Sequence, residues 1–204
     1  NVVACADYFK DKADAAGAQL SDLSLNFDQD GRPQIVTGSM QADWRSELTL
    51  DLTLTSRWLD LDRITGVSDD AGPIDGIAKF SARLRDLLPG QGKAKGTFTI
   101  DQANLGHDTV GPVRLALART DEKLEIQELR IGLPGGGRGE LQGSLSGSSQ
   151  AVTFDGSLGL RGTSVARFLA WAGGGALPID AKSDGPFGLR ARLVVGGGKV
   201  AARD

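Results

Sequence analysis

The first residues to consider are those whose types and spacing resemble a calcium-binding loop. Asn26, Asp28, Asp30 and Gly31 match the first half of a helix–loop–helix calcium site, where oxygen ligands recur at alternate positions. The twelfth position is Thr37, where that loop requires a bidentate Glu, and the flanking residues alternate as strands do. Asp, Asn and Gly also dominate turns, so we interpret the segment as a hairpin turn.

A glycine-rich run has the composition of a phosphate-binding loop. The run is Gly135-Gly136-Gly137-Arg138. It lacks the Lys and the Ser or Thr that end such a loop, and it leads into a predicted strand instead of a helix N-terminus. We therefore predict a flexible hairpin loop at this position.

Acid–base, nucleophilic and metal chemistry have few candidates. Asp60 and Asp62 precede Arg63, but residues two apart diverge on a helix, so helix capping and solvent exposure are favoured over a catalytic pair. His107 has no Ser, Cys or Asp partner at a recognisable spacing and is predicted to lie in a loop. With Cys5 as the one Cys, neither a structural zinc site nor an internal disulfide can form. We predict no enzymatic activity, no cofactor and no metal site.

The composition sets the frame for the elements that must position any site. The chain has 204 residues, a net charge of −3, 40% hydrophobic residues, 5% aromatic residues and 29 Gly, which favours a folded chain with many turns and thin packing layers. It lacks the clustered Lys and Arg of a nucleic-acid site, so we predict no nucleic-acid partner. No apolar run reaches the roughly 18 residues of a membrane-spanning helix. The chain begins with Asn1 and its one Met is Met40, so we expect a fragment or a processed piece.

Alternation of apolar and polar residues is the dominant pattern. Leu48, Leu50, Leu52 and Leu54 alternate with Thr and Asp, which predicts a strand with one apolar face. The same pattern recurs at 23–27, 35–44, 98–100, 113–117, 124–133, 141–145, 152–160 and 189–195. The parity changes near Glu128, so a bulge or a strand break is needed there to keep one face apolar. Short connections favour an antiparallel meander.

Three segments have helical periodicity. Residues 58–65 form a short segment, and 73–88 form the main amphipathic helix, with Pro73 suited to its first turn. A third helix is predicted over 164–172, with Ser164 as its N-cap.

A strand–helix unit is repeated in the chain. Residues 48–66 align without gaps on 152–170, with five identities. The identical pairs are Thr49 and Thr153, Asp51 and Asp155, Leu54 and Leu158, Arg57 and Arg161, and Arg63 and Arg167. Such repetition favours an extended architecture, which we divide into a first repeat over 1–91 and a second over 92–204. The fold class predicted is mainly β with a few short helices (α+β). Its sheet is antiparallel, strongly twisted and meandering, and forms a groove or an elongated β-sandwich.

The order and spacing of Leu and Gly residues along the chain resemble those of a known family. The order includes Gly-Thr-Phe-Thr-Ile-Asp over 96–101, Val-Arg-Leu-Ala-Leu over 113–117 and Leu-Pro-Gly-Gly-Gly-Arg-Gly-Glu-Leu-Gln-Gly over 133–143. It ends with Phe-Asp-Gly-Ser-Leu over 154–158 and Phe-Leu-Ala-Trp-Ala-Gly over 168–173, and Leu-Asp-Leu-Asp-Arg-Ile over 59–64 matches the repeated element. These residues resemble the AsmA family of Gram-negative envelope proteins over most of 20–195.

The resemblance implies a periplasmic protein, anchored at the inner membrane in its full-length form and involved in outer-membrane assembly or lipid transport. Phospholipid or another membrane lipid is the implied partner, with other envelope proteins as further partners. The anchor is absent from this sequence, so membrane association would need a missing segment. The length is short of a bridge between membranes, which leaves a segment of a groove. The alternative is a structural or adhesion-type β-repeat module that binds protein or glycan through its loops.

The candidate site residues are the apolar side chains of the alternating strands. The lipid-facing candidates are Leu48, Leu50, Leu52, Leu54, Leu115, Leu117, Phe154, Leu158 and Leu160. Sequence alone leaves open whether they form a covered core or an uncovered lipid-binding face. For Trp44, Trp58 and Trp171, packing in the core or at the end of a groove is favoured over a platform for ligand stacking.

Overall fold

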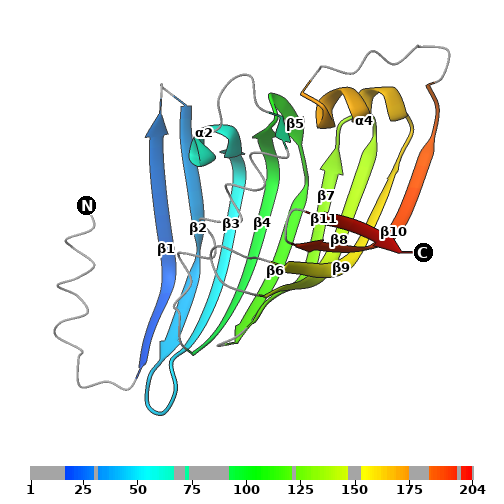
Figure 1. Cartoon of the computed structure of the whole chain (residues 1–204). Helices are drawn as coiled ribbons and strands as arrows, with labels where there is room; N and C mark the ends of the chain where they lie inside the picture. The colour runs from blue at the N-terminus through cyan, green and yellow to red at the C-terminus, as the bar shows by residue number, and fades with distance from the viewer. Residues whose placement is uncertain are drawn as a thin grey trace.

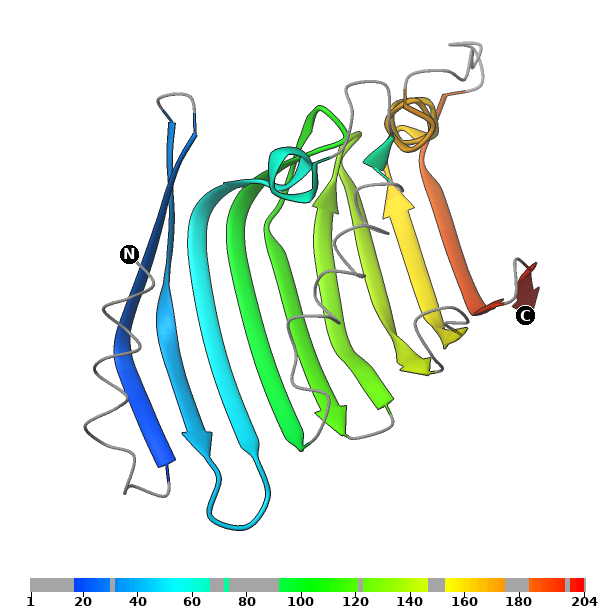
Figure 2. The same cartoon turned by 60° about the vertical axis from the view of Figure 1, so that its left-hand side comes forward.

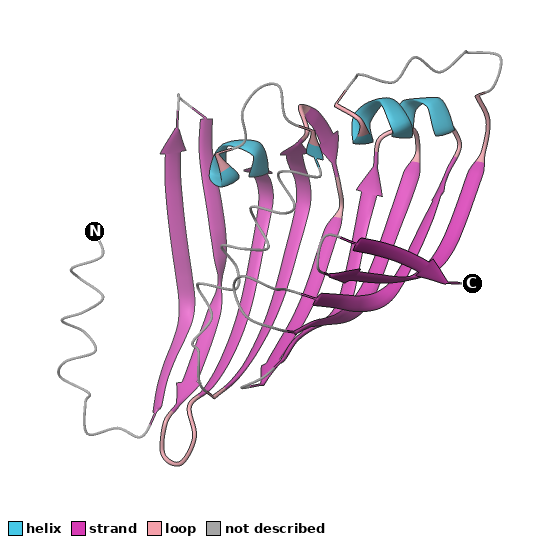
Figure 3. Cartoon of the chain, in the orientation of Figure 1, coloured by secondary structure: helices cyan, strands magenta, loops and turns pink. Residues whose placement is uncertain are grey.

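The computed structural model describes residues 17–29, 32–66, 72–73, 92–120, 123–146, 153–174, 184–196 and 199–203. The described chain is mainly β with short helices, which confirms the predicted fold class (Figure 1; Figure 3). Its strands are β1 (Gly17–Gln29), β2 (Arg32–Asp43), β3 (Thr49–Asp60), β4 (Lys93–Leu105), β5 (Asp108–Val110), β6 (Val113–Thr120), β7 (Lys123–Leu133), β8 (Gly137–Ser146), β9 (Thr153–Gly162), β10 (Phe187–Gly196) and β11 (Lys199–Arg203). The described helices are α2 (Leu61–Thr65) and α4 (Val165–Ala172).

The described strands form one open sheet. Its order is β1-β2-β3-β4-β6-β7-β8-β9-β10-β11, and the short β5 pairs with the last residues of β4. Sequence analysis left a groove and a β-sandwich open, and within the described residues no second sheet packs on the first. The hairpin predicted after Asn26 is confirmed, because β1 and β2 pair antiparallel as far as Gln29 and Arg32.

One pair of strands departs from the predicted antiparallel meander. β3 and β4 are parallel, from Thr49 beside Lys93 to Asp60 beside Asn104. The connection 61–92 allows this, since parallel neighbours require a crossover of a dozen or more residues. The same pairing joins the predicted repeats, 1–91 and 92–204, within one sheet.

The cross-strand register puts the alternating apolar residues on one face, which we call the apolar face. One row across it consists of Leu54, Phe98, Leu115, Leu129, Leu141, Leu158 and Ala191. The next row consists of Leu52, Gly96, Leu117, Ile126, Gly143, Gly156 and Leu193. The polar residues between them lie on the opposite face, as a strand period of two requires.

A bulge in β7 preserves this face. Ala116 pairs with Glu128, and the following residue, Leu117, pairs with Ile126, so Gln127 is extra. The register against β8 shifts at the same place. The predicted bulge near Glu128 is confirmed, and apolar residues on both sides of it keep one orientation.

Both copies of the repeat are a strand followed by a capped helix. Asp60 caps α2 by accepting the backbone N–H of Arg63 at 3.1 Å. Ser164 caps α4 by accepting the backbone N–H of Arg167, also at 3.1 Å, as predicted. The aligned copies therefore use aligned residues for the same local bond.

Two of the predicted helices differ from the described structure or lie mostly outside it. The helix predicted over 58–65 begins only at Leu61, because Trp58 to Asp60 extend β3 and pair with β4. The helix predicted over 73–88 lies outside the described residues, except for Pro73, which is helical. The short strands β5 and β11 have no counterpart in the predictions.

The best-buried apolar cluster lies at one end of the sheet, where α2, β5 and α4 gather (Figure 1; Figure 2). Its buried members are Ala103, Leu105, Val110 and Val113, and the residues packed against them are Leu61, Ile100, Leu129, Ile131 and Trp171. We call this the plugged end. The other end of the apolar face carries Arg119, between Ala94 on β4 and Leu124 on β7, and we call it the Arg119 end.

Candidate functional site

The predicted lipid-facing residues that lie on strands share the apolar face, and Leu48 directly precedes β3. They are Leu48, Leu50, Leu52 and Leu54 beside or on β3, Leu115 and Leu117 on β6, and Phe154, Leu158 and Leu160 on β9. Leu48 is exposed and Leu117 is buried, whereas the other seven are half-buried. The face therefore retains apolar surface in contact with solvent along three separate strands, which is the property that an apolar ligand needs.

Aromatic rings lie directly on glycine backbone within this face. A Cβ added to Gly156 would come within 2.5 Å of the Phe154 ring and 2.7 Å of the Gly143 Cα. A Cβ on Gly96 would come within 2.9 Å of the Phe98 ring. Glycine therefore lets each ring lie flat on the sheet and keeps the face shallow. Sequence reasoning gave Gly96 and Gly156 no role of this kind, although the two-residue spacing of Gly and Phe was a usable signal.

Polar groups at the plugged end form a closed network around Asp60. Its backbone N–H donates to Gln34 Oε1 at 2.9 Å, and Asn104 Nδ2 donates to its Oδ1 at 3.1 Å. Arg63 Nε lies 3.5 Å from the other carboxylate oxygen. Asp60 is buried, so the prediction that it caps a helix is confirmed and the prediction that it is solvent-exposed is wrong.

Asp62 ties the helix α2 to a turn of another strand pair. Its carboxylate accepts the backbone N–H groups of Gly106 at 2.8 Å and His107 at 2.9 Å. The predicted exposure of Asp62 is also wrong, because these two donors make its burial favourable. His107 lies in the turn between β4 and β5 with φ 60°, which confirms its predicted loop position.

The tryptophans differ in their surroundings. Trp171 packs against the buried cluster at the plugged end and donates from Nε1 to the Leu105 carbonyl at 2.8 Å, which confirms that it is a packing residue. Trp58 is half-buried on β3. For Trp44 the packing prediction is wrong, because it follows the last residue of β2 and is 43% exposed.

The turn predicted at Gly135 is a hairpin loop between β7 and β8. Gly135 and Gly136 have φ of 79° and 65°, which explains the use of glycine. The Gly135 carbonyl accepts both the backbone N–H of Thr163 at 3.2 Å and its hydroxyl at 2.9 Å. The loop therefore serves the junction between β9 and α4, and its carbonyl points inward where a phosphate cradle would need N–H donors.

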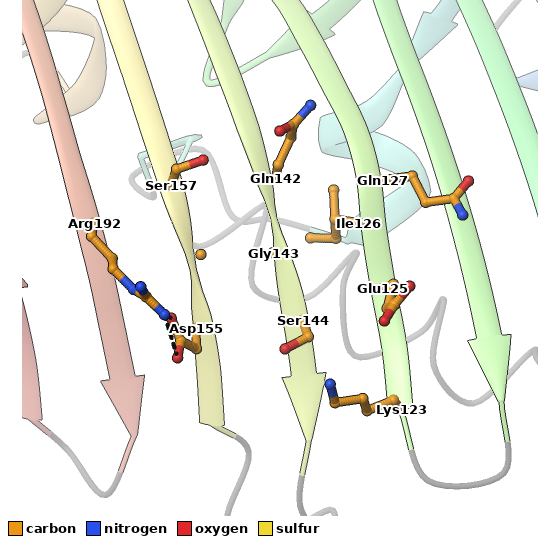
Figure 4. Close-up of a pocket in the computed structure, with 11 residues that line it drawn as sticks. Lys123, Glu125, Ile126, Gln127, Gln142, Gly143, Ser144, Asp155, Ser157 and Arg192 are labelled. Carbon is orange, nitrogen blue, oxygen red and sulfur yellow. Dashed lines mark hydrogen bonds and ion pairs between the residues drawn. The ribbon is translucent and has the colours of Figure 1, made fainter.

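The opposite face is charged and contains a shallow hollow of about 610 Å³ (Figure 4). The hollow is lined by Lys123, Glu125, Ile126, Gln127, Gln142, Gly143, Ser144, Asp155, Gly156, Ser157 and Arg192. Within it, Arg192 Nη2 lies 3.2 Å from Asp155 Oδ1. Most of its lining side chains are charged or polar, in contrast to those of the apolar face. Sequence reasoning missed it because four strands contribute to it.

Among the residues that the structure describes, no three His, Cys, Asp or Glu side chains come together as metal ligands. In the same part of the chain, no helix has the length and apolar character needed to cross a membrane. The backbone N–H of Ala166 and the hydroxyl of Ser164 hold the pKa of Asp184 below its ordinary 3.8. Asp184 therefore belongs to the cap of α4. Cys5 lies outside the described residues.

The arrangement as a whole offers an apolar surface that extends over the seven strands β3, β4, β6, β7, β8, β9 and β10, is plugged at one end and is backed by a charged face. The chain matches no protein-family model, no curated protein and no solved structure.

Proposed function

We propose that this chain is a non-enzymatic segment of an AsmA-like envelope protein that holds lipid acyl chains on its apolar face. The proposed process is outer-membrane assembly or lipid transport, and the proposed location is the periplasm, with the full-length protein anchored at the inner membrane. The observation that carries the proposal is the apolar row from Leu54 through Leu115 to Leu158, which crosses the sheet without a polar interruption.

The energetics of acyl-chain burial favour this use of the face. Each CH₂ group that leaves water contributes about 0.8 kcal/mol, so a few half-buried leucines can hold a chain. Such contacts have no preferred direction along the strand, so many acyl chains would bind with similar affinity. A protein that moves or stores lipids needs this tolerance.

The charged face of the sheet would stay in contact with water while the apolar face holds the acyl chain. On the opposite face, Glu128 lies between Arg114 at 2.9 Å and Arg130 at 3.0 Å, which keeps that side solvated. The plugged end closes one exit from the apolar face with the indole of Trp171. A bound chain would therefore lie along the strands on one side of the sheet.

Native mass spectrometry of the purified chain, followed by lipid extraction, tests the proposal. We expect phospholipid at a defined stoichiometry. The variant Leu54→Gln should reduce lipid occupancy several-fold, since it places an amide in the middle of the apolar row. The matched control is Thr53→Gln, which puts the same side chain on the opposite face of the same strand and should leave occupancy unchanged.

Thermal unfolding of both variants separates a loss of binding from a loss of folding. A wild-type chain that stays free of lipid after incubation with phospholipid vesicles would overturn the proposal. That result would favour the alternative, a structural or adhesion-type module that binds protein or glycan through its loops.

A further inference from the structure

The two ends of the apolar face differ in the charged side chains that they carry. At the plugged end, the acidic side chains Asp60 and Asp62 are buried, and each accepts hydrogen bonds from neighbouring backbone. At the other end, the apolar face carries a cation, Arg119. Arg63 Nε lies 3.5 Å from Asp60 and Arg167 pairs with Asp108, so the acidic groups of the plugged end have partners of their own.

Arg119 occupies a position that the alternating pattern reserves for apolar residues. It follows Val113, Leu115 and Leu117 in the same parity of β6, and its direct neighbours are Ala94 and Leu124. Along the described residues of β4, β6, β7 and β8, it is the one charged residue on the apolar register. Arg119 is half-buried, and both neighbours are buried.

The distance between the two ends of the apolar face matches the length of acyl tails in one leaflet of a bilayer. Arg119 and Val113 are six residues apart on one strand, which corresponds to roughly 20 Å at the rise of a β-strand. The hydrocarbon core of a bilayer is about 30 Å thick, so the tails of one leaflet span about 15 Å. An acyl tail beginning near Arg119 would therefore end before or at the apolar cluster of the plugged end.

We propose that the ligand of the apolar face is an anionic phospholipid, with its phosphate at Arg119 and its acyl tails directed toward the plugged end. This inference rests on the proposed lipid-holding function. A guanidinium presents a planar set of donors that matches phosphate oxygens in a bidentate way. The aliphatic part of the Arg119 side chain can lie on the apolar face while its charged head stays at the rim. The buried apolar cluster at the plugged end suits an acyl tail and not a charged head group, which disfavours the reverse orientation.

Two probes with the same acyl chains separate head-group recognition from tail binding. These are phosphatidylglycerol and the corresponding diacylglycerol, which lacks the phosphate. In native mass spectrometry, Arg119→Gln should lower phosphatidylglycerol occupancy about tenfold, as expected for the loss of a charge-assisted hydrogen bond. Diacylglycerol occupancy should stay unchanged. Arg119→Lys should retain part of the phosphatidylglycerol binding, because it keeps the charge and loses the bidentate geometry.

The matched control is Arg114→Gln, which removes a cation from the same strand on the opposite face. It should leave both occupancies unchanged. Equal losses in Arg114→Gln and Arg119→Gln would overturn the inference, because net charge would then explain the effect. Unchanged phosphatidylglycerol binding in Arg119→Gln would also overturn it and would assign Arg119 to packing alone. Both of these results leave lipid holding intact, whereas a wild-type chain that binds neither probe removes the proposed function itself.

Photo-crosslinking tests the orientation of the bound phospholipid on the apolar face. A phosphatidylglycerol with a photoreactive group at the end of one acyl chain should crosslink residues of the plugged end, such as Val113 or Trp171. A photoreactive group beside the glycerol should crosslink near Ala94 and Leu124. The reversed pattern would overturn the proposed orientation.

Discussion

The two strand–helix units, β3–α2 and β9–α4, share the same strand and N-cap pattern and differ in the residues that surround it. In each unit a strand ends at an N-cap residue, Asp60 or Ser164, which accepts a hydrogen bond from the Arg three positions later. The Arg side chains then diverge. Arg63 turns back to its own cap at 3.5 Å, whereas Arg167 pairs with Asp108 on β5.

The difference extends to burial and to the chain that follows. The cap of α2 is buried among Gln34 and Asn104 of other strands, whereas the cap of α4 is exposed and is shared with Asp184. α2 ends after five residues at Gly66, which has left-handed φ and ψ, and the chain returns to a parallel strand. α4 continues for eight residues and the chain returns antiparallel. A short local signal therefore specifies the unit, and tertiary partners decide how much each cap matters.

The largest expected effect comes from removing the two caps in turn. Asp60→Ala should lower the free energy of unfolding by about 3 kcal/mol, because it removes a buried cap and leaves the half-buried Asn104 amide without its acceptor. Ser164→Ala should cost only about 1 kcal/mol, since its site is exposed. Urea unfolding of each variant measures both values.

Asp60→Asn serves as the control, because it keeps an acceptor of the same size and should fall between wild type and Asp60→Ala. Equal destabilisation by Asp60→Ala and Ser164→Ala would contradict the comparison, since burial would then have no influence on the value of a cap.

A smaller effect should come from Trp171, which lies in the extra turn that α4 has and α2 lacks. Trp171→Phe keeps an aromatic ring in the cluster and removes the Nε1–H donor to the Leu105 carbonyl. We expect a loss of about 1 kcal/mol in urea unfolding, the usual net value of one hydrogen bond. Phe168→Leu tests the neighbouring ring contacts with Trp171 and Phe187, at 6.0 Å and 5.1 Å between centroids, without touching that bond. If Trp171→Phe is neutral, the bond does not hold α4 against the sheet.

The features that sequence analysis predicted correctly depend on local periodicity. Alternation identified the described strands other than β5 and β11 and the face they share, and the parity change at Glu128 required the bulge that β7 contains. The cap at Ser164 follows from residue type and position alone. Each of these patterns lies within about ten consecutive residues, so it can be recognised without knowledge of the tertiary structure.

The features that it missed depend on residues brought together from distant strands. The burial of Asp60 and Asp62 needs Gln34, Asn104 and the turn at Gly106, none of which is local. The parallel pairing of β3 with β4 joins residues 44 positions apart, such as Thr49 and Lys93. The hollow on the charged face, and the position of Arg119 opposite Ala94 and Leu124, likewise depend on register between strands.

The smallest expected effect is a pH dependence of the α4 cap, to which Asp184 contributes. The backbone N–H of Ala166 and the hydroxyl of Ser164 lower the pKa of Asp184 below 3.8, so the ionised carboxylate stabilises the N-terminus of α4. A depressed carboxyl pKa contributes stability that is fully present above the unfolded-state value and is lost as pH falls through the folded-state value. Asp184→Asn should therefore be slightly less stable than wild type near neutral pH, and the difference should shrink as the pH falls below 3.8. Hydrogen exchange of the Ala166 amide, followed across this range in both proteins, measures the local effect. If the difference were constant with pH, the hydrogen bonds of Asp184 would stabilise α4 through geometry alone and its charge would contribute nothing.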